Sequence, residues 1–409
     1  MIERPYYIDR LKRFRGTGLV KVLTGMRRAG KSGILRLLEQ ALLWEGVSPA
    51  SILLINLELI ENAALCEASA LLAHIKQHAP SQGTVYVLID EAQESCNIGR
   101  VAYSLLEDGR FDVCLTGSHT RLVEHALADV MAGRYVEIPV FPLSFAEYRT
   151  MHSAAGMSDD QLFAQYLGNG GLPHTISLEE DPYALRDYLD GVYHTVVRRD
   201  VTAELGHEDP ALLDAIARHL VGNLGSPSSA NRMAQSLSSS GRSCSDDTVS
   251  RYLSALTSAY AFHRVNRYDL KSHMLLKTQE KYYVDDLGLR TLLLGPQQGN
   301  LAGMLENVVY LELRRRFKDV HVGKHYARTI CFVAQGPQGR EYFMVEPSVL
   351  DQATLARALK PLQAERDNYP KTILTLDRIG TGSHDGIRQR NLIEWLLAAD
   401  SGDGDVCPR

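Results

Sequence analysis

One short stretch, Gly25–Ser32, constrains this chain more than any other feature. It reads GMRRAGKS and follows the apolar run at 19–24 directly. A glycine, four variable residues and Gly-Lys-Ser are typical of a loop that wraps phosphates between a strand and a helix. The loop N–H groups and the helix N-terminus supply positive potential, Lys31 reaches the β- and γ-phosphates, and Ser32 ligates Mg²⁺. The motif therefore predicts a parallel α/β sheet with a nucleotide at the carboxyl ends of its strands.

The sequence around this loop alternates between two patterns. Apolar runs stand at 19–24, 52–57, 85–90 and 112–117, and longer amphipathic stretches separate them. Such alternation is typical of βαβ units with right-handed crossovers. We expect four parallel strands with a helix after each of the first three. The residues expected to surround ATP are Gly25, Met26, Arg27, Arg28, Ala29, Gly30, Lys31, Ser32 and Gly33.

An acidic pair, Asp90 and Glu91, ends the third apolar run. An acid at the carboxyl end of a strand lies where α/β sheets bind ligands, so Asp90 is expected to hold the Mg²⁺ water shell. Glu91 is then placed to orient and deprotonate the attacking water. The next run ends in Thr-Gly-Ser, and Ser118 is expected to contact the γ-phosphate or the water, unless it is an ordinary N-cap.

Phosphoryl transfer also needs positive charge on the γ-phosphate in the transition state, and an arginine often supplies it. The candidates are Arg134, Arg198 and Arg199. We take Arg134 as the catalytic candidate, with a surface or lid salt bridge as the alternative for each of the three.

The chain beyond this sheet predicts further domains. After an ATPase domain at 1–143, residues 144–205 are mostly helical in pattern and are expected to form a lid. At 206–284, three helices precede two strand-like runs, which is the order of a winged helix. A small mixed α/β domain is expected at 285–400 and a flexible tail at 401–409.

Composition restricts the partners. The 409 residues include 44 basic and 49 acidic side chains, so the net charge of −5 gives no overall electrostatic signature for nucleic acid. Six scattered cysteines without a CxxC pair favour a reducing cytoplasm, and the absence of a long apolar run predicts no membrane span.

Local clusters of basic side chains could contact DNA phosphates or could serve as ordinary helix ends and surfaces. They are Arg251, Arg264, Arg267, Lys271, Arg314, Arg315 and Arg316.

Several segments together carry a family resemblance. They are GMRRAGKS, LIDEAQ, LTGS, GRYVEIPVFPLSFAEY, GNGGLP, VVRRDV and KYYVDDLGLR. The chain resembles a widespread prokaryotic family that joins an AAA-type ATPase domain to a C-terminal domain of uncharacterised function. The resemblance implies ATP binding and hydrolysis, a helical lid, a winged helix and a restriction-endonuclease-like C-terminal domain. GNGGLP is also similar to a lid motif of signalling ATPases, which implies that Pro173 faces the adenine.

The C-terminal domain departs from that family at its metal-binding positions. Where members carry Glu-x-Asp-Phe, this chain has Thr-Ile-Cys-Phe, so Cys331 replaces the metal-ligating acid. Glu306 and Glu346 remain, but Ser348 stands where an active nuclease would carry lysine and Met344 where the family has glutamine. One or two carboxylates cannot assemble the metal site that phosphodiester cleavage needs. We expect a catalytically inactive binding module.

The leading hypothesis is a Mg²⁺-dependent ATPase that acts as a conformational switch or remodeller, with DNA as a candidate partner through the winged helix. The alternative is a signalling or interaction scaffold that ATP locks in one conformation with little turnover. Protein partners and oligomeric state stay open. Nuclease activity is not expected, because Cys331 replaces the central acid.

Overall fold

The computed structural model describes residues 2–398 except 132, 154–155, 207–208, 240, 243, 297–298, 327 and 338, so the predicted tail at 401–409 lies outside the described residues. The chain divides into two compact units. Unit 1 is Met1–Phe141 with Ser258–Tyr260, and unit 2 is Pro142–Thr257 with Ala261–Arg409. Within the described residues, no helix has the length and apolar character needed to cross a bilayer.

Unit 1 is built on a five-stranded parallel sheet in the order β2-β3-β4-β1-β5. Its strands are β1 (Val20–Thr24), β2 (Ile52–Asn56), β3 (Val85–Asp90), β4 (Phe111–Gly117) and β5 (Tyr135–Pro139). The first four match the predicted apolar runs. The fifth strand was not predicted, and it pairs with β1 from Val20 opposite Tyr135 to Thr24 opposite Pro139. Its closing proline is compatible with a strand at the edge of the sheet.

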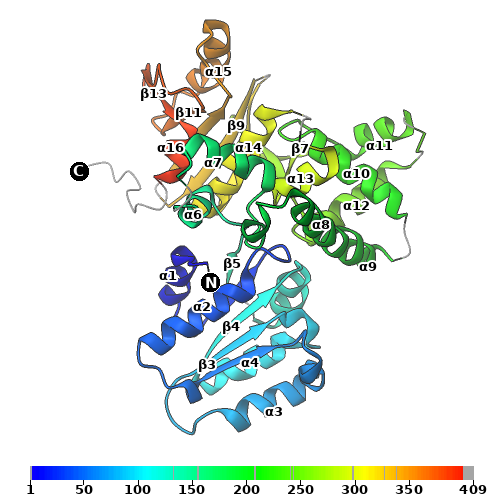
Figure 1. The fold of residues 1–409 in the computed structure, drawn as a ribbon, viewed down its shortest axis with the longest axis vertical. Coiled ribbons are helices and arrows are strands. Elements are labelled where there is room, and N and C mark those ends of the chain that lie inside the picture. The colour runs from blue at the N-terminus through cyan, green and yellow to red at the C-terminus, as the bar shows by residue number, and fades with distance from the viewer. Residues whose placement is uncertain are drawn as a thin grey trace. The chain divides into compact units, whose positions relative to one another are not determined.

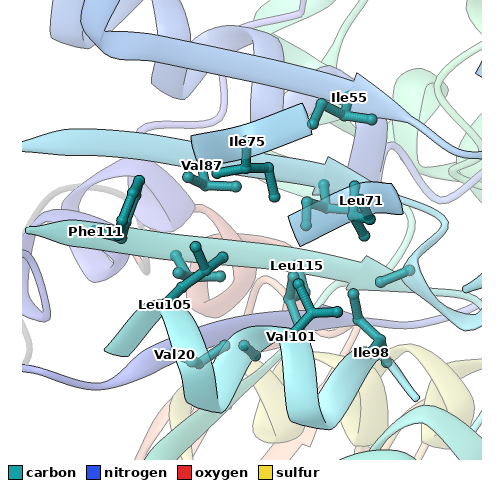
Figure 2. Packing of buried hydrophobic residues seen from close by; sticks show 14 of the residues in the cluster. Val20, Ile55, Leu71, Ile75, Val87, Ile98, Val101, Leu105, Phe111 and Leu115 are labelled. Carbon is teal, nitrogen blue, oxygen red and sulfur yellow. The ribbon is translucent and has the colours of Figure 1, made fainter. Parts of the chain in front are cut away.

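Helices cover both faces of this sheet (Figure 1). One core cluster joins the strands to α3 (Ala68–His78) and α4 (Ile98–Asp108), as Figure 2 shows for Leu71 and Ile75 of α3 and Leu105 of α4. The other cluster packs α1 (Pro5–Arg13) and α2 (Lys31–Trp44) on the opposite face. Shorter elements are η1 (Pro49–Ser51), η2 (Ile60–Cys66), η3 (Ala92–Glu94), η4 (Leu122–Leu127) and α5 (Ala128–Met131).

Unit 2 begins with a helical region whose first two helices start at capping boxes. The side chains of Ser144 and Ser158 each accept a hydrogen bond from the backbone N–H three residues on, and the serine N–H in turn donates to the side chain of that residue. The helices up to residue 258 are α6 (Phe145–Met151), α7 (Asp159–Asn169), η5 (Thr175–Leu178), α8 (Pro182–Tyr193), η6 (His194–Asp200), α9 (Val201–Leu205), α10 (Pro210–Gly222), α11 (Ala230–Ser239) and α12 (Asp246–Ser258).

A mixed eight-stranded sheet, ordered β12-β13-β11-β10-β9-β8-β6-β7, forms the rest of unit 2. Its strands are β6 (Phe262–Asp269), β7 (Met274–Val284), β8 (Asp319–His325), β9 (Arg328–Gly336), β10 (Gly339–Val345), β11 (Lys371–Thr375), β12 (Gly382–His384) and β13 (Ile387–Asn391). The accompanying helices are α13 (Leu287–Leu294), α14 (Leu301–Arg316), α15 (Gln352–Ala364) and α16 (Leu392–Leu397). Because β6 pairs with β8 in parallel, the hairpin predicted as a wing continues this sheet.

Candidate functional site

The loop between β1 and α2 has the backbone that a phosphate cradle requires. Gly25 and Gly30 adopt positive φ angles of 146° and 107°, and Gly30 is the N-cap of α2. A Cβ on Gly25 would lie 2.1 Å from the carbonyl oxygen of Val140, so only glycine fits there. Arg28 also has a positive φ, 69°, which is uncommon for a residue with a side chain. The predicted loop geometry is therefore present in the structure.

Lys31 is held at the mouth of this loop. Its side chain is buried, and Nζ donates hydrogen bonds to the carbonyl oxygens of Gly25 at 2.8 Å and Met26 at 2.9 Å. Ser32 and Gly33 follow in the first turn of α2, with Ser32 exposed. A glycine-lined cradle, a fixed ammonium group and an exposed hydroxyl at a helix N-terminus are groups that bind a nucleoside triphosphate with Mg²⁺. The residues present thus fit ATP and its metal.

An arginine near the N-terminus supports the loop from outside the motif. Arg4 is buried, donates from Nη1 to the carbonyl oxygen of Ala29 at 3.0 Å, and lies over the Tyr7 ring at 4.5 Å. Sequence reasoning missed Arg4, because only the packing of α1 on the sheet brings it to the loop. The one local signal was an arginine directly before the proline that begins α1.

Asp90 closes β3 at the carboxyl edge of the sheet, next to the loop. Its Oδ1 accepts a hydrogen bond from the Thr116 hydroxyl at 2.6 Å, and its Oδ2 accepts one from Asn56 Nδ2 at 3.2 Å. These donors come from the strands on either side, β4 and β2. The carboxylate is therefore fixed in orientation, as a group that holds a metal shell must be. Neither Thr116 nor Asn56 was predicted.

Glu91 stands at a bend immediately after β3, with a positive φ of 52°. Its backbone N–H donates to the Thr116 hydroxyl at 2.9 Å, which places its side chain over the end of β4. There Oε2 accepts hydrogen bonds from the Ser118 hydroxyl at 3.0 Å and from Gln93 Nε2. The structure thus brings Ser118 and Gln93 to Glu91, and sequence reasoning missed both contacts. Contact of Ser118 with the γ-phosphate or the water stays a prediction.

The charge state of Glu91 follows from opposing effects. Burial acts to raise the pKa of its carboxyl group. The positive charges of Lys31 and Arg27, with the hydrogen bonds from Gln93 and Ser118, outweigh burial and hold that pKa below its ordinary value. Glu91 is therefore a carboxylate at neutral pH, the form that can accept a proton from water.

Arg134 does not join this group, and Arg198 has an acidic partner within unit 2. Arg134 precedes β5 and is exposed, paired with Glu107 and lying over the Tyr103 ring at 5.3 Å. Because β1 and β5 are parallel and Arg134 precedes β5, Arg134 lies at the amino ends of the strands. The loop lies at their carboxyl ends, roughly 16 Å away by strand length. In unit 2, Arg198 forms two hydrogen bonds with Asp214, at 2.6 and 3.2 Å, which is the salt-bridge alternative. The prediction that Arg134 contacts the γ-phosphate bound to its own chain is therefore wrong, because the side chain lies at the other end of the strands.

The segment GNGGLP, which contains Pro173, lies in unit 2, where it contacts Asp286 of the segment KYYVDDLGLR. Asp286 accepts hydrogen bonds from the backbone N–H groups of Gly171 at 2.7 Å and Gly288 at 2.8 Å. A Cβ on Gly170 would lie 2.1 Å from Asp286 Oδ1, which accounts for the glycine pair. Burial raises the pKa of Asp286 to about 7 despite these hydrogen bonds. Contact of Pro173 with adenine stays a prediction.

The positions that resemble a nuclease centre also lie in unit 2. Glu306 on α14 is buried and accepts hydrogen bonds from Lys281 Nζ at 2.6 Å and from the Tyr283 hydroxyl. Burial raises the pKa of the nearby Cys331 thiol to about 12, so it is not a thiolate ligand at neutral pH. Among the described residues, no group of three or more His, Cys, Asp or Glu side chains could hold a metal ion.

The arginines that end α14 are engaged within unit 2. Arg315 and Arg316 both bind Glu312, and Arg316 also lies 3.9 Å from the centre of the Trp395 ring. Arg314 donates to a backbone carbonyl four residues on. These contacts favour the structural reading of the cluster over phosphate binding.

Comparison with known proteins identifies both parts of the chain. Residues 17–149 match the family described as an AAA domain, and residues 160–299 match a domain of unknown function. An uncharacterised protein of Haemophilus influenzae is 31% identical over 400 residues, covering 97% of this chain and 99% of the relative.

More distant similarities extend to archaea. An uncharacterised protein of Methanocaldococcus jannaschii is 24% identical over 314 residues, covering 73% of this chain and 67% of the relative. The structure of the Walker-type ATPase of Pyrococcus abyssi is similar with a TM-score of 0.49 and 14% identity, over 72% of this chain and 96% of that one. Because residues 17–149 match the AAA-domain family and a relative is 31% identical along 97% of this chain, the chain belongs to a family of prokaryotic AAA-type P-loop ATPases with a C-terminal domain of unknown function.

Proposed function

We propose that this protein binds Mg²⁺-ATP, hydrolyses it, and acts in the cytoplasm as a conformational switch or remodeller. The observation that carries this proposal is Glu91, a buried carboxylate kept ionised beside Lys31 and fixed by hydrogen bonds. A chain that only retained nucleotide would not need a poised base at this position.

Each residue has a distinct task in this proposal. The loop N–H groups and Lys31 bind the phosphates, while Ser32 and the oriented Asp90 would hold Mg²⁺. When bound, the metal neutralises charge on the phosphate oxygens. Glu91 takes a proton from the attacking water, and Ser118 steadies that carboxylate through its 3.0 Å hydrogen bond.

The test is steady-state ATP hydrolysis by the purified chain, with Glu91→Gln as the variant and Glu94→Gln, exposed on the same turn, as the matched control. We expect turnover in the wild type and the control and a loss of about a hundredfold or more in Glu91→Gln, since proton transfer contributes at least that much. Equal rates in all three proteins would refute the assignment of the base.

The alternative is a nucleotide-locked scaffold with little turnover. It predicts tight ATP binding that disappears in Lys31→Ala, and no hydrolysis in the wild type under any condition. The two hypotheses are therefore separated by the same assay once ATP binding is measured beside it.

DNA remains a candidate partner, and the feature that supports it is the succession of α10, α11 and α12 before the β6–β7 hairpin. Arg251 is exposed on α12, and Arg267 forms a hydrogen bond with Gln279. Stimulation of ATP hydrolysis by duplex DNA, lost in Arg251→Ala and weakened by salt, is the expected result. Rates that DNA leaves unchanged would redirect the search to protein partners.

Arg134 could contact the γ-phosphate only in the site of a neighbouring chain, because in its own chain it lies at the end of the strands opposite the loop. In that case turnover should rise with protein concentration, and Arg134→Ala should lose the concentration-dependent part. Mixing Arg134→Ala with Lys31→Ala should then restore activity. Turnover independent of concentration would exclude Arg134 from catalysis.

A further inference from the structure

Gln93 occupies an unusual position beside the proposed base. It lies on η3, two residues after Glu91, and its Nε2 donates to Glu91 Oε2 and also lies 3.2 Å from the Ser118 hydroxyl oxygen. Since Ser118 itself donates to Glu91 Oε2 at 3.0 Å, the three side chains form a closed triangle. A carboxylate cannot donate, so the amide must present its NH₂ group to Glu91.

This arrangement leaves the other end of the amide unsatisfied. Gln93 Oε1 is inaccessible to solvent and has no hydrogen-bond partner within the described part of the chain. An unpaired buried acceptor lowers stability, so such groups call for an explanation beyond folding.

Asp90 does not depend on Gln93. Its two oxygens are held by Thr116 and Asn56, which are separate donors on neighbouring strands. The Gln93 amide therefore acts on the proposed base and on Ser118, and leaves the proposed metal-holding acid untouched.

We propose that Gln93 is a positioning residue for ATP hydrolysis, which fixes Oε2 of Glu91 against Ser118 and thereby presents Oε1 to the attacking water. The inference rests on the proposed hydrolysis. With two donors, Oε2 is occupied, whereas no hydrogen bond to Oε1 is found among the described residues. The carboxylate is then held with one oxygen anchored and the other directed to the proton.

The variant that tests this role is Gln93→Leu, which keeps the approximate volume and removes both ends of the amide. We expect kcat to fall about tenfold or more while the affinity for ATP changes less than twofold, since Gln93 contacts the base and not the loop. A loss of kcat without a loss of ATP affinity is the split that distinguishes positioning of the base from a general structural defect. The thermal midpoint should change little, because removal of the unpaired acceptor offsets the lost hydrogen bond to Glu91.

Glu94→Leu on the same turn is the matched control, with an exposed side chain, and should change neither kcat nor the affinity for ATP. An unchanged or increased kcat in Gln93→Leu, or a loss of ATP affinity as large as the loss of kcat, would overturn the proposal.

If the wild type shows no turnover, the proposed hydrolysis is refuted. The hydrogen bond between Gln93 and Glu91 can still be tested without turnover. The contact itself is then tested by thermal unfolding of the nucleotide-free protein at pH 7 in a double-mutant cycle. The effect of Gln93→Leu on the midpoint should differ between the wild type and a Glu91→Gln background, because the Gln93 amide donates to a carboxylate only in the wild type. Equal effects in both backgrounds would refute the contact.

Discussion

At Gly25 the loop passes so close to Val140 that a single methyl group decides whether the cradle can form. Gly25→Ala would place Cβ 2.1 Å from a backbone carbonyl oxygen and would force alanine into a φ of 146°. We expect a loss of about 2 kcal/mol in the stability of unit 1 and at least a tenfold loss in ATP affinity. Thermal unfolding and ATP titration would measure the two effects.

Gly33 supplies the control for this prediction. It lies in α2 two residues after Lys31, and a Cβ built there meets nothing within 4 Å. Gly33→Ala should raise stability by up to about 1 kcal/mol, since alanine favours the helix. If Gly25→Ala and Gly33→Ala lose the same stability, the close approach of the Val140 carbonyl does not explain the loss at Gly25.

The sequence predicted the residues of this site that belong to contiguous motifs, including the loop, Lys31 and the Asp90–Glu91 pair. It did not predict Asn56, Thr116 or Gln93. The roles of Asn56 and Thr116 depend on strand order, because β3 lies between β2 and β4 only in the folded sheet. Gln93 was visible in the motif LIDEAQ, but nothing local indicated that its amide meets Ser118.

At the scale of elements, Asp286 joins the glycine-rich turn after α7 to the start of α13. In the folded chain its pKa is about 7, raised by burial from an ordinary value of 3.8. The folded state therefore holds more protons than the unfolded state between these values, and stability falls as pH rises through this window, by up to about 1.4 kcal/mol per pH unit. Asp286→Asn removes the titrating group.

We expect Asp286→Asn to be less stable than the wild type at pH 4.5, because an amide replaces one of two accepting oxygens. The difference should narrow as pH rises to 7.5, since only the wild type loses stability there. Thermal midpoints across this range would measure it, with Asp187→Asn, exposed on α8, as a control that follows the wild type. A difference that widens with pH would show that the Asp286 carboxyl has a lowered pKa.

Several elements could not be predicted because their partners are distant in sequence. The strand β5 has five residues, ends in proline and contains a single buried side chain, Ile138, and it becomes a strand through pairing with β1. Both strands of the hairpin were predicted, but their place in an eight-stranded sheet follows from β6 pairing with β8, more than fifty residues later. Periodicity reveals which face of an element is apolar, and it does not reveal what covers that face.

At the scale of the whole molecule, the chain consists of two units with separate sheets, and the nucleotide-binding motifs of the loop and the acidic pair lie in unit 1. A ligand that binds only the folded state raises stability by about 2.7 kcal/mol at a hundred times its Kd. We therefore expect Mg²⁺-ATP to raise a thermal transition of the wild type and to leave that transition unchanged in Lys31→Ala. A shift of equal size in both proteins would place ATP binding elsewhere.

The central claim is that Glu91 converts bound ATP into turnover, and a single-turnover experiment tests it most directly. Excess protein would be mixed with labelled ATP and Mg²⁺, and the bound nucleotide analysed over time in the wild type and in Glu91→Gln. The account predicts that both proteins bind ATP, that the wild type converts it to ADP and phosphate, and that Glu91→Gln retains it uncleaved. Cleavage at the same rate in both proteins would contradict the account.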